Sequence, residues 1–329
     1  MTSFKAILVS KDDEGYQARI TSLSTEQLPE EPIEVAVEYS TLNYKDALAI
    51  TGESPIVRHF PLVPGIDLAG FVTKSEDPKF KVGDAVLLNG WGVGESWWGG
   101  MSQRAAVRGE WLLPLPELFS TKEAMAIGTA GYTAALCVLA LQQHNIMPTD
   151  GEILVTGASG GVGGIAVNLL SNLGYRVVAS TGKSSETGWL KRQGASDVID
   201  RTELSSSSKP LVRERWCGVV DTVGSRTLAS ACASTQYGGV VTACGLAQGM
   251  EFPATVAPFI LRGITLVGID SVYCSKTRRL QAWDLLAKYL ERAALQGLIT
   301  TIGLDEVSER APDMLAGRLK GRVVVDVNV

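Results

Sequence analysis

Three glycines at a regular spacing give the clearest chemical signal in this 329-residue sequence. Gly157, Gly160 and Gly163 directly follow the apolar run "ILVT" and stand at the start of a helix-favouring segment. Glycine suits positions where a strand turns sharply into a helix, where the backbone approaches a pyrophosphate, and where the helix packs closely on the strand. The unpaired amides of the first helical turn then face the phosphates. The pattern predicts a dinucleotide site, with a purely structural turn as the alternative. The expected donors are the backbone amides of Ser159, Gly160, Gly161 and Val162.

The residues after the next apolar run indicate which dinucleotide would bind. An NAD site usually has an acidic residue about 20 positions beyond the first glycines, where it binds the ribose 2′-hydroxyl. Here that place holds two hydroxyl side chains, a glycine and a lysine, and the nearest carboxylate is Glu186. Because a lysine and hydroxyls suit a 2′-phosphate, the sequence predicts NADP(H); a solvated loop lysine is the alternative. Arg201, just after the following strand, could reach the same phosphate. The residues at that place are Ser180, Thr181, Gly182 and Lys183.

A second chemically rich stretch is "TLNYKDALAITG", residues 41–52. Asn43, Tyr44, Lys45 and Asp46 place four polar or charged side chains in a row, directly before an apolar run. A phenol keeps its proton at neutral pH, so Tyr44 could donate a hydrogen bond or a proton to a substrate. The alternative is a structural tyrosine bonded to the backbone. Asp46 could fix the local loop, and we expect Lys45 to point into solvent.

Composition and charge argue against several classes of partner. The net charge is −5 and no basic run exceeds two residues, so we expect no nucleic-acid partner. We expect no membrane partner either, because no apolar stretch comes near ~18 residues and the N-terminal residues lack a signal-peptide pattern. Five cysteines, without a C-x-x-C pair, argue against a disulfide framework and favour the cytoplasm.

The histidines and cysteines form no metal-binding pattern. His59 and His144 are the only histidines, and the five cysteines are far apart in the sequence. Zinc sites usually take their ligands from His, Cys and carboxylates that are clustered or closely spaced. We therefore expect no metal and ordinary packing or surface roles for both histidines.

The elements that must position these groups change character along the chain. Residues 1–120 contain short apolar or alternating runs separated by Gly, Pro and Asp, the pattern of a small β-barrel-like domain. Ser120, with Glu123 three residues later, has capping-box spacing and predicts the start of a long apolar helix. Beyond it strand and helix segments alternate, which predicts an α/β fold with a doubly wound parallel sheet. The final run "GRVVVDVNV" has strand character, so we expect the chain to end by rejoining the first domain.

Seven segments together are similar to one family. They are "LNYKDALAITG", "PLVPGIDLAGFV", "VGDAVLLNGWGVGE", "GTAGYTAALCV", "VTGASGGVG", "DTVG" and "APFILRGITLVGIDSV". The chain resembles the acrylyl-coenzyme A reductase family, in the zinc-free quinone-oxidoreductase branch of the medium-chain dehydrogenases/reductases. The resemblance implies a GroES-like catalytic domain of residues 1–122 and 271–329. It also implies a Rossmann NADP-binding domain of residues 123–270 and a homodimer joined through the Rossmann sheets.

The resemblance also implies what the reaction requires. Zinc-dependent members carry Gly-His-Glu where this chain has Gly65-Ile66-Asp67. Without a Lewis acid, hydride addition suits the β-carbon of a conjugated acyl thioester, and hydrogen-bond donors must face the carbonyl oxygen on which charge develops. We expect Tyr44 to contact both substrate and nicotinamide, and Asn43 to hold the phenol, the nicotinamide or the thioester. Asp46 completes the expected catalytic set. Further cofactor contacts are expected from Leu246, Ile260 and Ser271, with Arg322 nearby.

Three functions are open at this point. The first is NADPH-dependent reduction of acrylyl-CoA to propionyl-CoA, and the second is an NADPH:quinone or enone oxidoreductase with another acceptor. The third is a non-catalytic NADPH-binding regulatory protein, against which the polar set Asn43, Tyr44 and Asp46 argues. The loop "GWGVGESWWGG", residues 90–100, either forms a mobile wall of the active site or is packed by its own aromatic side chains.

Overall fold

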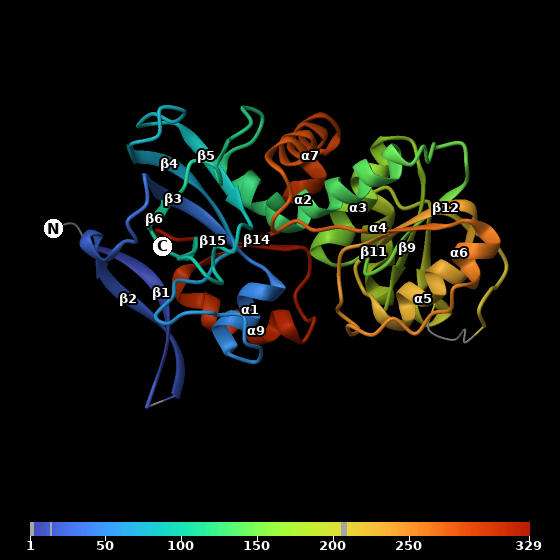
Figure 1. The fold of residues 1–329 in the computed structure, drawn as a ribbon, viewed down its shortest axis with the longest axis horizontal. Helices are drawn as coiled ribbons and strands as arrows, with labels where there is room; N and C mark the ends of the chain where they lie inside the picture. Colours follow the sequence, from blue (N-terminus) through green and yellow to red (C-terminus); the bar gives the residue numbers. More distant parts are fainter. Residues whose placement is uncertain (1–2, 14, 205–208) are drawn as a thin grey trace. The chain divides into compact units, whose positions relative to one another are not determined.

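The chain divides into two compact units in a computed structural model that describes residues 3–13, 15–204 and 209–329 (Figure 1). The first unit contains Met1–Thr129, Val272–Lys276 and Gln296–Val329, and the second contains Ala130–Ser271 and Thr277–Leu295. The sequence-based division placed residues 123–129 with the second of these units, and Ser271 and residues 277–295 with the first, so the compact units differ from it there.

The first unit is built on a seven-stranded, mainly antiparallel sheet and a two-stranded hairpin. Its elements are β1 (Ser3–Asp12), β2 (Gly15–Ser24), β3 (Ile33–Leu42), α1 (Tyr44–Thr51), β4 (Asp67–Ser75), β5 (Ala85–Asn89), β6 (Arg104–Val107), β7 (Leu113–Pro114), β14 (Ile299–Gly303), α9 (Val307–Leu315) and β15 (Arg322–Asp326). The strand order is β14-β15-β3-β4-β5-β7, with β6 also paired to β3. In β3, Ile33, Val35 and Val37 alternate toward the core, as the period of two requires. Since β15 pairs antiparallel with β3, the end of the chain returns to the N-terminal sheet, as predicted.

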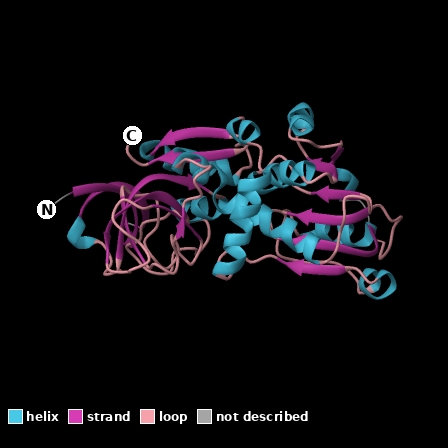
Figure 2. Cartoon of the chain, turned by 90° about the horizontal axis from the view of Figure 1, so that it is seen from above, coloured by secondary structure: helices cyan, strands magenta, loops and turns pink. Residues whose placement is uncertain are grey.

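The second unit is built on a six-stranded parallel sheet, whose strands run in one direction in Figure 2. Its elements are β8 (Glu152–Val155), α3 (Gly161–Asn172), β9 (Arg176–Thr181), α4 (Thr187–Arg192), β10 (Asp197–Asp200), β11 (Trp216–Asp221), α5 (Ser225–Ser234), β12 (Thr235–Ala243), α6 (Ala257–Arg262), β13 (Thr265–Gly268) and α7 (Lys276–Tyr289), followed by α8 (Arg292–Gln296). The order β10-β9-β8-β11-β12-β13 is the doubly wound 3-2-1-4-5-6 arrangement. The predicted α/β fold class is therefore confirmed.

Helix α2 (Thr121–Gln143) contains the point where the two units divide. Its predicted start is confirmed, because Ser120 N donates to Glu123 Oε2 (2.9 Å) and Glu123 N donates to Ser120 Oγ (3.2 Å). The expectation that no apolar stretch reaches membrane-spanning length is wrong for this helix, which is long and apolar enough. However, 89% of its apolar window is buried inside the protein, and a core helix of a globular protein meets the same criteria.

Candidate active site

The polar stretch 43–46 caps a helix. Asp46, in the first turn of α1, accepts at Oδ2 from the Asn43 backbone N (2.9 Å) and from Asn43 Nδ2 (3.0 Å). Its Oδ1 accepts from the backbone N of Ile66 (2.9 Å). A carboxylate at this position satisfies backbone amides outside the helix ladder and complements the positive end of the helix. Asp46 therefore fixes the start of α1 and joins it to the segment that leads into β4.

Asp67, the first residue of β4, is fully buried and surrounded by donors. Its Oδ1 accepts from Asn89 Nδ2 (2.6 Å) and Thr129 Oγ1 (2.6 Å). Its Oδ2 accepts from Thr129 N (2.9 Å) and Asn43 Nδ2 (2.8 Å). These four hydrogen bonds compensate the loss of water around the carboxylate. Sequence reasoning noted Asp67 only as the residue in the Gly-His-Glu position and missed its role in joining these elements.

Arg322, the first residue of β15, is 3% exposed and is linked to Asp67 through Asn43. Arg322 Nη2 donates to Asn43 Oδ1 (3.1 Å), and the Nδ2 of the same amide donates to Asp67. The guanidinium also donates to Thr41 Oγ1 (3.2 Å) and to the carbonyl oxygen of Ala126 (2.8 Å). We call Asn43, Asp46, Asp67 and Arg322 the buried polar cluster.

A glycine leaves the space that the buried polar cluster needs. Gly128 breaks the helical geometry of α2 with a φ of 50° and a ψ of −161°. A Cβ atom there would lie 2.8 Å from both Arg322 Nη2 and Asp67 Oδ2. Both the left-handed φ and the close approach of the two charged groups require glycine at this position.

The charges of the buried polar cluster perturb one another. Burial raises the pKa of Asp46 to about 7; the charge of Asp67 adds to the rise, whereas hydrogen bonds from Asn43 and Ile66 oppose it. Burial also lowers the pKa of Arg322, against the influence of the two carboxylates. With two carboxylates and one guanidinium, the cluster has one negative charge in excess when all three are ionised. A proton on Asp46 removes this excess.

Tyr44 directly follows Asn43 of the buried polar cluster in the chain, and it remains accessible. It is the first residue of α1, its side chain is 48% exposed, and its hydroxyl has no hydrogen-bond partner within the described ranges. It is therefore not the backbone-bonded structural tyrosine that was the alternative. Lys45, expected to point into solvent, instead forms an ion pair with Glu95 (Nζ–Oε1 2.8 Å). The ion pair links α1 to the 90–100 loop.

The 90–100 loop is held by packing and backbone hydrogen bonds. Trp91 N donates to Val272 O (3.0 Å), and Gly100 N donates to Gly65 O (2.9 Å). The Trp97 and Trp111 rings lie 5.6 Å apart, and the guanidinium of Arg108 lies over both, 4.6 Å and 4.9 Å from their centroids. These contacts favour the packed loop over the mobile wall.

In the second unit, the predicted phosphate-binding turn connects β8 to α3. Gly157 has a φ of 58°, and Gly160 is the N-cap of α3. A Cβ atom on Gly163 would lie 2.4 Å from Gly157 O, which explains the third glycine of the pattern. Ser159 Oγ lies 2.9 Å from Thr181 Oγ1 at the end of β9. The turn therefore meets the segment that was predicted to bind the 2′-phosphate.

The side chains of residues 180–183 differ in their exposure to solvent. Ser180 and Thr181 are buried, 1% and 4% exposed, and Thr181 Oγ1 accepts from Lys183 N (3.1 Å). Arg201, which follows β10, lies directly against Gly182. The predicted set is therefore together in space, but Lys183 and Arg201 are better placed than the two buried hydroxyls to meet an anion.

The remaining predicted cofactor residues are in the second unit. Leu246, in the loop after β12, and Ile260, on α6, are 57% and 72% exposed. Ser271 is partly buried, and its carbonyl oxygen accepts from Arg279 Nη2 (3.2 Å). Leu246 follows the carboxyl end of β12, the side of a parallel sheet at which dinucleotides bind.

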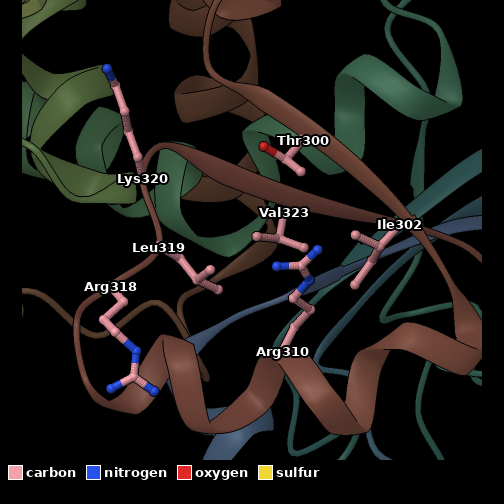
Figure 3. A pocket seen from close by; sticks show the side chains of 7 residues that line it. All are labelled: Thr300, Ile302, Arg310, Arg318, Leu319, Lys320 and Val323. Carbon is pink, nitrogen blue, oxygen red and sulfur yellow. The ribbon is translucent and has the colours of Figure 1, made fainter.

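The pocket in Figure 3 is lined by none of the predicted site residues. Within the described part of the chain, no three His, Cys, Asp or Glu side chains come together as a metal-binding group. The pocket, of about 190 Å³, lies in the first unit among β14, β15 and α9 (Figure 3). Arg310 points into it, toward Val323 and Leu319, whereas Lys320 points away.

Comparisons with known proteins agree with this architecture. Residues 29–117 match the "Alcohol dehydrogenase GroES-like domain" model, and residues 161–288 match the "Zinc-binding dehydrogenase" model. The chain is 48% identical to "Probable acrylyl-CoA reductase AcuI" of Escherichia coli, over 98% of this chain and 100% of that protein. It is also 48% identical to "Acrylyl-CoA reductase AcuI" of Ruegeria pomeroyi, over 99% of both chains. The chain belongs to the acrylyl-CoA reductase family.

One further relative of this acrylyl-CoA reductase family member is named as a quinone oxidoreductase, and solved structures of relatives contain NADP or NAD. "Putative quinone oxidoreductase YhfP" of Bacillus subtilis is 45% identical over 98% of this chain and 99% of that one. Among solved structures, the yhdH oxidoreductase of Salmonella enterica, in complex with NADP, superposes with a TM-score of 0.96. It is 48% identical, over 98% of this chain and 99% of that one. B. subtilis yhfP, solved with NAD bound, has a TM-score of 0.95 at 45% identity, over 99% and 100% of the chains.

The raised pKa of Asp46 predicts a pH-dependent stability. Between its ordinary 3.8 and about 7, the folded protein keeps a proton that the unfolded chain releases. The free energy of unfolding therefore falls as pH rises through this window, by about 1.4 kcal/mol per unit. Asp46→Asn lacks this titration, so between pH 5 and 8 we expect wild type to lose roughly 2 to 3 kcal/mol relative to the variant.

The measurement is the free energy of unfolding of wild type and Asp46→Asn at both pH values. The exposed Asp13→Asn serves as the control and should track wild type at both. A difference between wild type and Asp46→Asn that is the same at pH 5 and pH 8 would show that Asp46 titrates normally.

Proposed function

We propose that this protein reduces the C=C bond of an α,β-unsaturated acyl thioester with NADPH, converting acrylyl-CoA to propionyl-CoA. The observation that carries the proposal is 48% identity, over nearly the whole chain, to two acrylyl-CoA reductases. The half-exposed Tyr44 on the buried polar cluster supplies a donor of the kind this reaction requires.

The chemistry divides between nucleotide and protein. NADPH, when bound, supplies the hydride to the β-carbon, and negative charge develops on the thioester oxygen. A phenol held near that oxygen stabilises the charge, because a fixed donor needs no reorganisation as the charge forms. The α-carbon then takes up a proton from Tyr44 or from water. Asn43 and Asp46 act as positioning residues, since their polar atoms already bind Asp67, Arg322 and Ile66.

Nucleotide binding would use the turn between β8 and α3. In this proposal the amides of residues 159–162 bind the pyrophosphate. Lys183 and Arg201 meet the 2′-phosphate, while Tyr44 contacts the nicotinamide. The NADP complex of the S. enterica relative supports NADP(H). The exposed side chains of Leu246 and Ile260, together with Ser271, complete the proposed contacts.

The second candidate function is quinone or enone reduction, which the B. subtilis relative's name favours. NADPH oxidation should be followed with acrylyl-CoA, crotonyl-CoA and a quinone side by side. We expect the highest kcat/KM with acrylyl-CoA. Faster turnover of the quinone would favour the second function, and NADPH binding without turnover of any acceptor would indicate a regulatory protein.

Tyr44→Phe should lower kcat/KM for acrylyl-CoA by about tenfold or more, because the oxyanion loses a preorganised donor. The dissociation constant for NADPH should change little, since the ring remains. Lys45→Gln, which alters the neighbouring ion pair, is the matched control and should lose less. If Tyr44→Phe loses under about threefold, some 0.65 kcal/mol, the phenol has no catalytic role and water becomes the donor.

We also propose a homodimer joined through β13, an edge strand of the parallel sheet. An uncovered edge can pair with the same edge of a second copy about a two-fold axis. Large apolar side chains are exposed on α6 and the loop before it, next to β13 in the sequence. They are Met250, Phe252, Val256 and Leu261. The cytoplasmic location stays a prediction.

Leu261→Asp should convert the dimer to monomers, because it places a charge in the apolar contact. Sedimentation velocity at micromolar concentration measures the mass. Val82→Asp, at an equally exposed apolar residue of the first unit, should leave the dimer intact. Wild type that sediments as a monomer would contradict the proposal, as would a Leu261→Asp variant that keeps the dimer mass.

A further inference from the structure

Gly182 and Arg201 are brought side by side by the register of two strands. In the parallel pair β9 and β10, Thr181 is aligned with Asp200, the last residue of each strand. The next residues are Gly182 and Arg201. Both therefore leave the sheet at its carboxyl edge, where the β8–α3 turn also lies.

The side chain of Arg201 occupies the place that a side chain on Gly182 would need. A Cβ atom on Gly182 would lie 2.6 Å from Arg201 Nε, 2.7 Å from Cδ and 2.9 Å from Cζ. Real Cβ atoms do not approach other atoms so closely. The Arg201 side chain therefore lies directly against Gly182, and a larger residue at position 182 would displace it.

Arg201 keeps its donors available. It is exposed and forms neither a hydrogen bond nor an ion pair with the residues that the structure describes. Its neighbour Asp200 gives its Oδ1 to the backbone N and the hydroxyl of Thr202 (2.8 Å and 2.6 Å). These hydrogen bonds, more than the charge of Arg201, lower the pKa of Asp200. Packing on Gly182 thus orients an arginine that forms no ion pair with a described carboxylate.

We propose that Gly182 determines coenzyme specificity, because its missing side chain lets Arg201 lie across the end of β9 and bind the 2′-phosphate of NADPH. This inference rests on the proposed NADPH-dependent function. A planar guanidinium can bind two phosphate oxygens at once, which a hydroxyl-bearing NADH ribose cannot exploit. The contribution of Gly182 is indirect: it shapes the position of Arg201 and leaves the pyrophosphate turn unchanged.

The test is equilibrium binding of NADPH and NADH to the full-length protein, with 2′,5′-ADP and 5′-AMP as acceptor-independent probes. Gly182 has no left-handed φ, so the backbone tolerates Gly182→Ala and only Arg201 must move. We expect this variant to bind NADPH about tenfold or more weakly, with NADH affinity unchanged within about twofold. Arg201→Ala should give the same selective loss, and the double variant should lose no more than either single one.

Gly188→Ala is the matched control, since the nearest atom to its new Cβ would be Arg192 Nη1 at an ordinary 3.7 Å. It should leave both affinities unchanged. An equal loss of NADPH and NADH in Gly182→Ala would overturn the inference, as would unchanged NADPH affinity in Arg201→Ala. Wild type that binds neither nucleotide would overturn both proposals. Tight NADPH binding without reduction of any acceptor would overturn the proposed reaction alone.

Discussion

The first unit depends on the burial of one charged side chain: the guanidinium of Arg322 lies away from water and needs other partners for its hydrogen bonds. Arg322 can be buried only if hydroxyl, carbonyl and amide oxygens replace its hydration. They come from Thr41 on β3, from Ala126 on α2 and from Asn43, whose amide nitrogen in turn donates to Asp67 on β4. Because Arg322 begins the last strand, its solvation joins the end of the chain to residues near its beginning.

The same cluster explains how an exposed phenol can be held in place. Asp46 and Asn43 are committed to backbone amides and buried charges, so α1 begins at a fixed point and Tyr44 projects from its first turn. An accessible donor held on a fixed helix start is what a reaction that builds charge on a carbonyl oxygen needs.

Local signals predicted the second unit well, because a glycine turn and alternating apolar runs are short-range features. The first unit was harder. Helix α1 and strand β2 were not recognised, and α9 contains Pro312, which argues against a helix. In the site, Asn43 and Asp46 stand in one polar run, but Asn89 and Thr129 reach Asp67 across 22 and 62 residues. Arg322, 279 residues from Asn43, was expected near the cofactor from the family resemblance alone. No spacing in the sequence encodes such contacts.

We propose above all that this chain delivers a hydride to the β-carbon of an acyl thioester. Its most direct test uses NADPH that carries deuterium at the transferred position, with acrylyl-CoA as acceptor and mass spectrometry of the acyl product. We expect propionyl-CoA with one deuterium, located at the β-carbon, and a solvent-derived hydrogen at the α-carbon. Propionyl-CoA without the label, or with the label at the α-carbon, would contradict it.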